Sequence, residues 1–507
     1  MISLSSLSVS DYIAPSQNCV IPVQKEEVVK VSLNDCLACS GCVTSAESVL
    51  ISEQGIDELD ALLKENFSKS LETKQIFVAS IEPQVATSFA ALYNLPLTQA
   101  YFFISGFLHK TLGFDYVLDS AVAQCLSVQA LISEVESRLD PILSSPNPPD
   151  QTSLSKLPLL SGTCPGFVCY LEKVHPTLIP HLLHAPSVQH MQGVLVKYFF
   201  APILSTVQNI PPTIPLQKRI YHVAFSPCYD RKIESLRWAK TAPIIGTEFP
   251  VVDSVLTLKE LLTLFERHHI VLSDPQTFQN PPFPLSPCDH AFGLSCILTP
   301  ESVFPSYPAP SGGYAESVER HLVERVTAGT VNAMNQGQFE QSIQKRWASK
   351  VTKSQTNNAL EFSYENPSLP MPVTTAAVFG FRHLQTMIQK LKAAQRQSSS
   401  ALQSYMFVDL EACPSACLGG GGLPSAVVNE KAVVENLQSV QQSYSPIFAD
   451  KQTPLVSIPT DIAASLPFGE ETSVLDALQH VCFFFFVSNW MSTVSSSVPS
   501  CLFVISS

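Results

Sequence analysis

Three cysteines lie close together in the stretch CLACSGC, at Cys36, Cys39 and Cys42. Thiolates at this short spacing suit a cubane iron–sulfur cluster, which accepts neighbouring thiolates around its corners and takes a fourth from elsewhere. Bacterial cluster-binding runs continue to a further cysteine three residues on, but none follows Cys42 at that distance. Cys19 is the nearby candidate for the fourth ligand.

A zinc site is the main alternative for this group. Structural zinc prefers two separated CxxC pairs, each of which gives two ligands to a tetrahedron. Three consecutive ligands from one short loop fit that geometry poorly. Gly41 suits a tight loop around a cluster because it has no Cβ. The spacing therefore favours an iron–sulfur cluster over zinc, and a chance grouping of buried thiols is the remaining alternative.

Four more cysteines occur in distinctive surroundings. Cys164 lies in the turn SGTCPGF, Cys228 follows the apolar run IYHVAF, and Cys413 and Cys417 follow YMFVDL in EACPSACLGGGG. Ligands of open α/β sheets bind at the carboxyl ends of strands, where the last three cysteines are expected to lie. Taken singly, each is typical of a small buried residue. Taken together in these contexts, they indicate a second metal-binding set.

The spacing within the last motif predicts its local structure. Cys413 and Cys417 are four residues apart, so one helical turn would place both thiols on the same side. We expect the glycines at 419–422 to let the backbone approach a bulky cofactor closely. A phosphate-binding loop is the competing interpretation, but the glycines lack the Lys-Ser or Lys-Thr that such a loop requires.

The elements that position these cysteines are predicted from the apolar pattern. Short runs rich in β-branched or aromatic residues indicate buried strands at 75–81, 114–119, 220–225, 250–255 and 405–410. Helical patterns lie between them, such as 257–267, which opens with a capping box of Thr257 and Glu260. Strands that alternate with helices predict an α/β fold with mostly parallel sheets, buried on both faces.

A second helix is predicted at 381–395 from its spacing of apolar residues. Its expected buried face consists of Leu384, Met387, Ile388 and Leu391. Two proline-rich stretches, 140–150 and 274–313, are expected to be surface loops or linkers, because proline removes a backbone donor and breaks regular elements.

Composition limits the class of protein. The chain has 507 residues, of which 45% are hydrophobic and 14% charged, with a net charge of −13. The acidic balance argues against a nucleic-acid partner, which requires a basic face. The N-terminus lacks the pattern of a signal peptide, and the apolar stretch at 481–487 is too short to span a membrane. We therefore expect a cytoplasmic protein whose fourteen cysteines serve metal or redox chemistry rather than disulfides.

The motifs together resemble a known family. CPGF, SPCYDRKIE and EACPSACLGGGG are similar to the cluster-binding motifs of iron-only hydrogenases. With DYIAPSQNCV and CLACSGCVTSAE added, the chain resembles the iron-only-hydrogenase-like assembly factors of the cytosolic iron–sulfur machinery (the nuclear prelamin A recognition factor-like family) from residue 11 to about 422.

This resemblance implies two 4Fe–4S clusters. The ligands of the first would be Cys19, Cys36, Cys39 and Cys42, and those of the second, between two lobes, Cys164, Cys228, Cys413 and Cys417. It also implies a two-lobed hydrogenase-like α/β fold with mostly parallel sheets and a small N-terminal ferredoxin-like segment. We divide the chain into a cluster segment at 1–75, a two-lobed domain at 76–430 with a Pro-rich insert at about 274–313, and a C-terminal extension at 431–507 that packs on it.

Three positions argue against hydrogenase activity. By the resemblance, Thr163, Ser226 and Arg231 stand where hydrogenases carry a proton-relaying Cys, a Met and a Lys. A hydroxyl relays protons poorly compared with a thiol, whose pKa is about 8.5. The resemblance thus implies a non-enzymatic factor that takes clusters from upstream scaffold proteins and delivers them through the targeting complex to cytosolic and nuclear apo-proteins. The alternatives are a hydrogenase-related redox enzyme and a zinc-stabilised interaction adaptor.

The chain also departs from the assembly family. Arg231 replaces the usual Lys, Ala416 the usual Gly and Phe167 the usual Trp. Ala416 would be strained if its position requires a positive φ, which Gly adopts more readily. Relatives often end in an aromatic residue that helps docking, whereas this chain ends VISS. We therefore expect the targeting complex to contact another surface.

Overall fold

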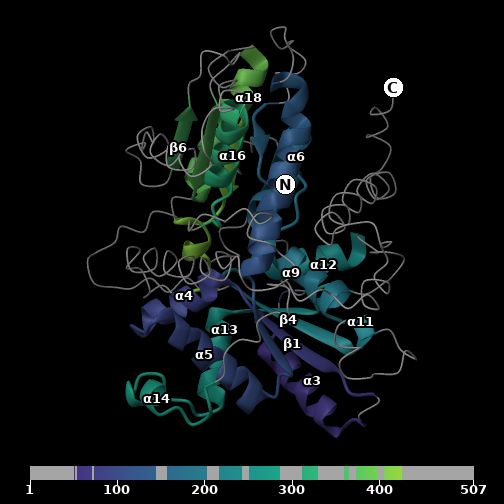
Figure 1. Ribbon diagram of the computed structural model, residues 1–507, viewed down its shortest axis with the longest axis vertical. Coiled ribbons are helices and arrows are strands. Elements are labelled where there is room, and N and C mark those ends of the chain that lie inside the picture. The colour runs from purple at the N-terminus through teal and green to yellow at the C-terminus, as the bar shows by residue number, and fades with distance from the viewer. Residues whose placement is uncertain are drawn as a thin grey trace, which may run out of the picture.

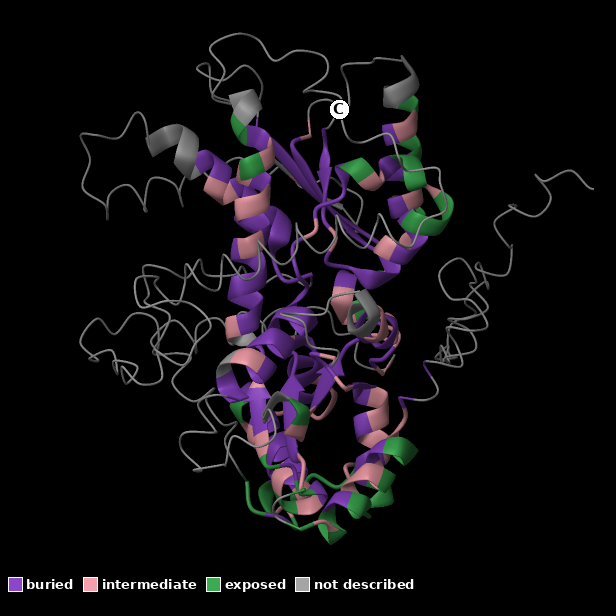
Figure 2. Cartoon of the chain, turned by 90° about the vertical axis from the view of Figure 1, so that its right-hand side faces the viewer, coloured by how far each residue is buried: buried purple, intermediate pink, exposed green. Residues whose placement is uncertain are grey.

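Two four-stranded sheets, one in each half of the molecule, form the framework of this computed structural model (Figure 1). The structure describes residues 51, 54–70, 73–143, 157–201, 216–241, 250–285, 311–328, 359–364, 373–397 and 405–424. Buried residues fill both sheets and the region between them (Figure 2). The architecture is an α/β fold with mostly parallel sheets, as the sequence predicted.

The first sheet is entirely parallel, in the order β2–β1–β4–β5. Its strands are β1 (Ile76–Ile81), β2 (Tyr116–Asp119), β4 (Ile220–Ser226) and β5 (Ser254–Thr257). Ile81 at the end of β1 is in register with Phe225 near the end of β4. Every residue of β1 is buried, because helices cover both faces of a parallel sheet.

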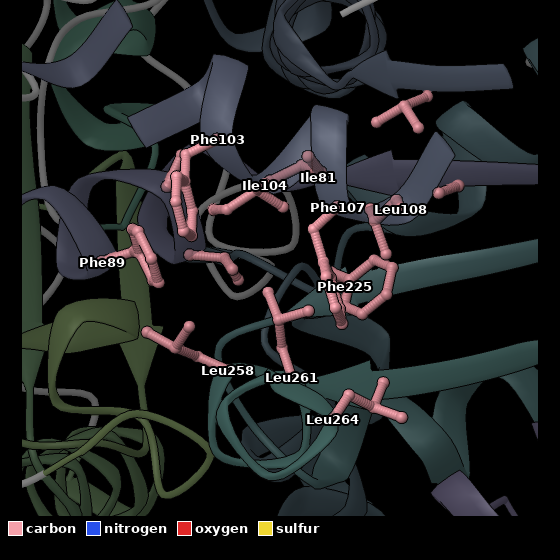
Figure 3. Packing of buried hydrophobic residues seen from close by; sticks show 14 of the residues in the cluster. Ile81, Phe89, Phe103, Ile104, Phe107, Leu108, Phe225, Leu258, Leu261 and Leu264 are labelled. Atoms are coloured by element: carbon pink, nitrogen blue, oxygen red, sulfur yellow. The ribbon is translucent and has the colours of Figure 1, made fainter. Parts of the chain in front are cut away.

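One face of this sheet carries an aromatic core. It is covered by α3 (Ile56–Ser68), α4 (Pro83–Leu92), α5 (Leu97–Phe107) and α13 (Leu258–Arg267). Figure 3 shows Phe89, Phe103 and Phe107 packed among the leucines of α13. The rings of Phe107 and Phe265 lie 4.1 Å apart between centroids. Such rings bury a large apolar area and give this half of the molecule most of its packing.

The opposite face of the first sheet carries other helices. They are α9 (Val188–Val194), which continues as the π-helical turn η5 (Leu195–Phe200), together with the start of α6 (Ala121–Leu143). A second π-helical turn, η3 (Leu108–Leu112), extends α5. Two short helices, α11 (Leu216–Arg219) and α14 (Gln276–Gln279), lie at the periphery, and α12 (Asp230–Thr241) follows β4.

The second sheet has the order β3–β8–β7–β6, and only β6 runs antiparallel. Its strands are β3 (Leu159–Leu160), β8 (Phe407–Glu411), β7 (Val373–Phe379) and β6 (Ala359–Tyr364). Helices α6 and α16 (Tyr314–Ala328) cover one face. Helices α8 (Pro165–Val174) and α18 (Phe381–Gln397) cover the other, with the 3-10 turn η4 (Pro176–His181) after α8.

Most predicted elements are confirmed. The strands expected at 75–81, 114–119, 220–225 and 405–410 correspond to β1, β2, β4 and β8, whereas the one expected at 250–255 begins later, at Ser254. The capping box is present, since Thr257 accepts a hydrogen bond from the Glu260 amide and donates its own amide to the Glu260 carboxylate. All four expected apolar residues of α18 are buried.

The interpretation of the proline-rich stretches as surface loops is wrong in part. Helix α6 continues through Pro141 to Leu143, because the ring removes only one of the hydrogen bonds of a 23-residue helix. In the second stretch, Phe278 and Phe283 are buried in the aromatic core, 4.8 Å and 5.0 Å from the ring of Phe103. Burial of these rings overrides the loop character of the flanking prolines.

Several predictions concern residues outside the described ranges. Residues 1–50 and 425–507 lie outside the described residues, so the division at 75 and 430 stays a prediction. The same holds for 144–156 and 286–310 within the proline-rich stretches. In the described part of the chain, no helix combines the length and the apolar character needed to cross a membrane.

Candidate metal centre

Four of the eight predicted cysteine ligands lie in the described residues and come from both halves of the molecule. Cys164 is the N-cap of α8 and follows β3, and Cys228 lies between β4 and α12. Cys413 and Cys417 lie in the loop after β8. All four therefore follow carboxyl ends of strands, where ligands of α/β sheets bind. Cys164 is buried and the other three are partly buried.

The Cys413 thiol lies within electrostatic range of the other three. Burial raises the pKa of Cys164 well above its ordinary value, and the charges of Glu411, Cys413 and Cys417 raise it further. Burial also raises the pKa of Cys228 and that of Cys417, and the charge of Cys413 raises both pKa values further. The thiols of Cys164, Cys228 and Cys417 therefore hold their protons in this form, and metal binding would release them.

The donor set fits an iron–sulfur cluster. Sulfur atoms reach one buried place from three separate loops, and thiolates are the ligands that such clusters use. Within the described ranges, no three His, Cys, Asp or Glu side chains are close enough to hold one metal ion.

The loop from Cys413 to Cys417 is not an α-helical turn, so that prediction is wrong. Ser415 and Ala416 both have left-handed backbones, with φ of 60° and 54°, and a short 3-10 helix η7 (Ala416–Gly419) follows. The two consecutive left-handed residues fold the chain back tightly. Ala416 is thus at a position with positive φ, which is the condition under which we expected its methyl group to be strained.

The glycines after Cys417 lie in close contact with backbone carbonyl groups. A Cβ on Gly419 would lie 1.5 Å from the carbonyl oxygen of Pro414, and one on Gly420 would lie 2.4 Å from that of Pro227. The Gly422 amide donates a 3.0 Å hydrogen bond to the same Pro227 carbonyl. Gly420 and Gly422 are required because the third loop packs directly on Pro227, the residue before Cys228, and Gly419 because the loop packs on its own Pro414. Their close approach to a cofactor stays a prediction.

The first cysteine loop is packed on the other two in the same way. A Cβ on Gly166 would lie 2.8 Å from the Asp230 carboxylate and 3.4 Å from the Ala412 Cβ. Gly166 thus lies two residues after Cys164 and touches residues that flank Cys228 and Cys413. Three loops that are far apart in sequence therefore meet in direct contact around the four thiols.

Charged residues surround the thiols. Arg231 is buried and forms an ion pair of 2.7 Å with Glu234. The charges of Glu234 and Glu82 raise the pKa of Arg231 against the effect of burial, and those of Cys228 and Cys417 add to it. The carboxylate of Glu411 accepts a hydrogen bond from the Cys417 thiol at 3.8 Å between Oε2 and Sγ.

Sequence reasoning missed the carboxylates and the amide of this site. Glu82 follows β1 directly and accepts a hydrogen bond from Ser226, and Gln189 Nε2 donates 3.0 Å to the Arg231 carbonyl. Glu411 is the last residue of β8. The rule that sites form at carboxyl ends of strands identifies Glu82 and Glu411, but it is silent on Gln189, which belongs to a helix.

The other cysteines divide into two groups. Cys125 and Cys169 are buried among apolar residues, in agreement with their lack of a motif, and burial raises the pKa of Cys169 to about 12. The predicted ligands of the first cluster and four cysteines without a motif lie outside the described residues: Cys19, Cys36, Cys39, Cys42, Cys288, Cys296, Cys482 and Cys501.

Comparison with known proteins identifies the class. Residues 75–421 match the family model described as iron only hydrogenase large subunit, C-terminal domain. The apo FeFe-hydrogenase of Chlamydomonas reinhardtii is 20% identical, with a TM-score of 0.52, over 76% of this chain and 88% of that one. A FeFe-hydrogenase structure on oxygen inactivation by degradation of the H cluster 2Fe subcluster gives the same values. Fold and cysteine loops together define a chain with a hydrogenase-like large-subunit domain.

Full-length relatives narrow this class. The cytosolic iron-sulfur assembly component 3 of Mus musculus is 32% identical over 478 residues, which cover 88% of each chain. The cytosolic Fe-S cluster assembly factor narfl of Xenopus tropicalis is 30% identical, over 88% of this chain and 89% of that one. The factor nar1 of Aspergillus fumigatus is 32% identical, over 89% and 84%. The chain belongs to this family of hydrogenase-like cytosolic iron–sulfur assembly factors, which confirms the resemblance of its motifs.

Proposed function

We propose that this chain is a cytosolic iron–sulfur assembly factor that binds two 4Fe–4S clusters and helps to deliver clusters to apo-proteins. One observation carries the proposal: three loops from two lobes bring Cys164, Cys228, Cys413 and Cys417 to one buried place. The names of the full-length relatives support the same role. The three loops pack directly on one another around these thiols.

The two sets of thiols have different tasks in this proposal. Cys164, Cys228, Cys413 and Cys417 would hold one cluster between the lobes and so tie the two sheets together, because metal-binding free energy is also folding free energy. Cys19, Cys36, Cys39 and Cys42 would hold the other on a small segment that recipients can reach. A bound cubane supplies an electron store and a unit that incoming thiolates can capture.

The residues next to the buried thiols argue against hydrogen chemistry. The Thr163 hydroxyl is buried and lies 2.8 Å from the Ser161 hydroxyl. The Ser226 hydroxyl donates to the Glu82 carboxylate. Both hydroxyls are therefore committed to the protein interior, and neither has the thiol chemistry of a proton relay. A hydrogenase-related redox enzyme is the alternative function, and the chain's hydrogenase-like domain is its support.

The partners in this proposal are proteins. They are upstream scaffold proteins, the cytosolic targeting complex and apo iron–sulfur proteins, with neither nucleic acid nor membrane among them. The net charge of −13 favours protein partners over nucleic acid. The proposed division at residues 75 and 430 would leave the N-terminal segment as the exchange site.

Anaerobic reconstitution with iron and sulfide tests the proposal. The wild type is expected to bind about eight irons and about eight sulfides per chain. Cys39→Ala and Cys417→Ala should each lose about half of the iron, with loss of a different EPR signal in each case. Cys169→Ala is the matched control, because Cys169 is buried near the site but belongs to no motif.

Three results would overturn the proposal. They are a wild type that binds zinc and no iron, loss of all iron on either single substitution, and hydrogen evolution by the fully loaded protein. Delivery is tested separately, by mixing the loaded wild type with the apo form of a cytosolic iron–sulfur enzyme in the presence of a chelator. Recovery of that enzyme's activity is expected, and Cys39→Ala should deliver less.

A further inference from the structure

One buried arginine lies at the centre of the charges around the four thiols. Arg231 belongs to the first turn of α12, three residues after Cys228, and is 5% exposed. Its charge acts on Cys228, Cys417 and Glu411. Among the described basic residues nearby, Lys232 pairs with Glu260, and Lys259 donates to the Gly421 carbonyl. Arg231 is therefore the cation that faces the thiols.

The guanidinium is held in a fixed position by its neighbours. Its Nη1 lies 2.7 Å from the Glu234 carboxylate one helical turn away. Its backbone carbonyl accepts a hydrogen bond from Gln189, which also accepts one from Ser226 at 3.2 Å. Glu82, bound by the same Ser226, adds a second negative charge close to Arg231. These contacts restrain the side chain before any ligand arrives.

One N–H donor of this guanidinium has no acceptor among the described residues. The buried Nε of Arg231 has no hydrogen-bond partner among the residues that the structure describes. A buried N–H without an acceptor destabilises the fold, so native proteins rarely leave one. The neighbouring thiols become strong acceptors when they lose their protons to metal, and a cluster adds sulfide sulfurs to them.

We propose that Arg231 is a positioning and tuning residue of the buried cluster, whose Nε–H donates to a sulfur of that cluster or of its cysteines and whose charge raises its reduction potential. This inference rests on the proposed function of the four cysteines. Reduction adds one negative charge to the cluster, and a fixed positive charge stabilises the reduced form more than the oxidised one in a buried site. Lys at this position could supply the charge but not the planar, preoriented fork.

A reductive titration of the reconstituted protein tests the charge. One electron passes from dithionite, through mediators, to the buried cluster, while dithionite is oxidised and no proton is required. Arg231→Gln is expected to keep the cluster and to shift its midpoint potential to a lower value. Arg231→Lys should fall between Arg231→Gln and the wild type. Arg237→Gln is the matched control, because Arg237 lies on the same helix, partly exposed and paired with Glu172, and it should leave the potential unchanged.

Hyperfine spectroscopy of the labelled wild type tests the hydrogen bond directly. In protein labelled with 15N-arginine, the reduced buried cluster should show a nitrogen coupling and an exchangeable proton coupling. Both should disappear in Arg231→Lys and persist in Arg237→Gln. If Arg231→Gln does not load with iron, this experiment on the wild type still decides the question.

The outcomes separate this inference from the proposed function. A fully loaded Arg231→Gln with the wild-type potential, or a labelled wild type without the nitrogen coupling, overturns the role of Arg231 and leaves the cluster in place. Absence of iron at the buried site in the wild type, measured against Cys417→Ala, overturns the proposed function itself.

Discussion

The two sheets of this protein differ in how their interiors treat polar groups. In the first sheet, the buried His222 is fully bonded: its Nδ1 donates to the Val251 carbonyl at 3.0 Å and its Nε2 accepts from Ser80 at 2.8 Å. In the second, Glu316 on α16 has one buried carboxylate oxygen, Oε2, without a hydrogen-bond partner in the described residues. This second half also supplies three of the four cysteines, Cys164, Cys413 and Cys417.

This difference indicates a division of labour. The first sheet packs against an aromatic core that stabilises the fold. The second sheet places buried carboxylates close to the cysteine site. Burial raises the pKa of Asp409 to about 6 and that of Glu316 to about 7, and burial of Glu411, with the charge of Asp409, raises its pKa as well. Local features that destabilise the fold commonly mark functional regions.

The largest expected effect lies in the scaffold. Phe103 is fully buried and its ring contacts those of Phe89, Phe265, Phe278 and Phe283. Phe103→Ala should lower the free energy of unfolding by about 3–5 kcal/mol, measured by denaturant titration. Phe67→Ala, at a side chain that is 89% exposed, should change it by less than about 0.5 kcal/mol. If folded Phe103→Ala lost its iron, the aromatic core and the cysteine site would not be independent of each other.

The second expected effect concerns Glu316. Burial raises its pKa from 4.5 to about 7, so the folded state binds a proton that the unfolded state has released. Stability from this group is complete below pH 4.5 and is lost as the pH rises to about 7. The shift of about 2.5 units corresponds to roughly 3 kcal/mol.

Glu316→Gln should therefore stabilise the cluster-free protein at pH 8, by up to about 3 kcal/mol, and have little effect at pH 4. Denaturant titrations at several pH values measure this. The exposed Glu58→Gln is the control. A Glu316→Gln profile parallel to that of the wild type would mean that this carboxyl does not titrate on unfolding.

The first sheet should respond to pH in the opposite direction. Burial lowers the pKa of His222 from 6.5 to about 3, so the unfolded state takes up a proton that the folded state excludes. Stability from the neutral ring is complete above pH 6.5 and is lost as the pH falls towards 3. At pH 5 the loss from this residue is about 2 kcal/mol.

His222→Gln should remove that pH dependence, although it also changes the hydrogen bonds to Ser80 and Val251. The slope of the free energy of unfolding between pH 5 and pH 6.5 is the quantity to compare with the wild type, rather than its absolute value. The exposed His268 offers the control variant His268→Gln. An unchanged slope in His222→Gln would remove the contrast between the sheets.

The smallest expected effect concerns Ala416. Glycine would relieve the strain of the left-handed backbone, which stabilises the fold by about 1–2 kcal/mol. It would also remove a buried methyl group, which costs about 0.8 kcal/mol, and increase the freedom of the unfolded chain, which costs about 0.4–1 kcal/mol. Ala416→Gly should therefore change the free energy of unfolding by less than about 1 kcal/mol. A thermal melt with iron content unchanged would check this, and a large gain would show that the methyl group strains the loop.

Prediction from sequence succeeded where the signal is local. The capping box at Thr257 and the apolar face of α18 depend on spacings of three and four residues, which a helix turns directly into contacts. Strands β3, β6 and β7 were not predicted. β3 has only two residues, and the other two depend on pairing with strands distant in sequence.

The cysteine motifs show the same limit within one site. Their composition indicated a metal centre, but the loop after β8 took a left-handed path at Ser415 and Ala416 instead of a helical turn. Gly420 and Gly422 are required by contact with Pro227, which lies in the other lobe and far away in the sequence. No spacing within the loop contains that information.

The amino-acid sequence by itself determined the class of this protein and its alternation of strands and helices. It also determined the cysteines that make a soft-metal site chemically possible. Residue type and short spacing are sufficient for these three conclusions. Only the tertiary structure decided which groups surround the thiols. Arg231, Glu82 and Gln189 come together through the pairing of β1 with β4 and the packing of α9 on them. Electrostatics and burial depend on distances across the fold, and no local pattern encodes them.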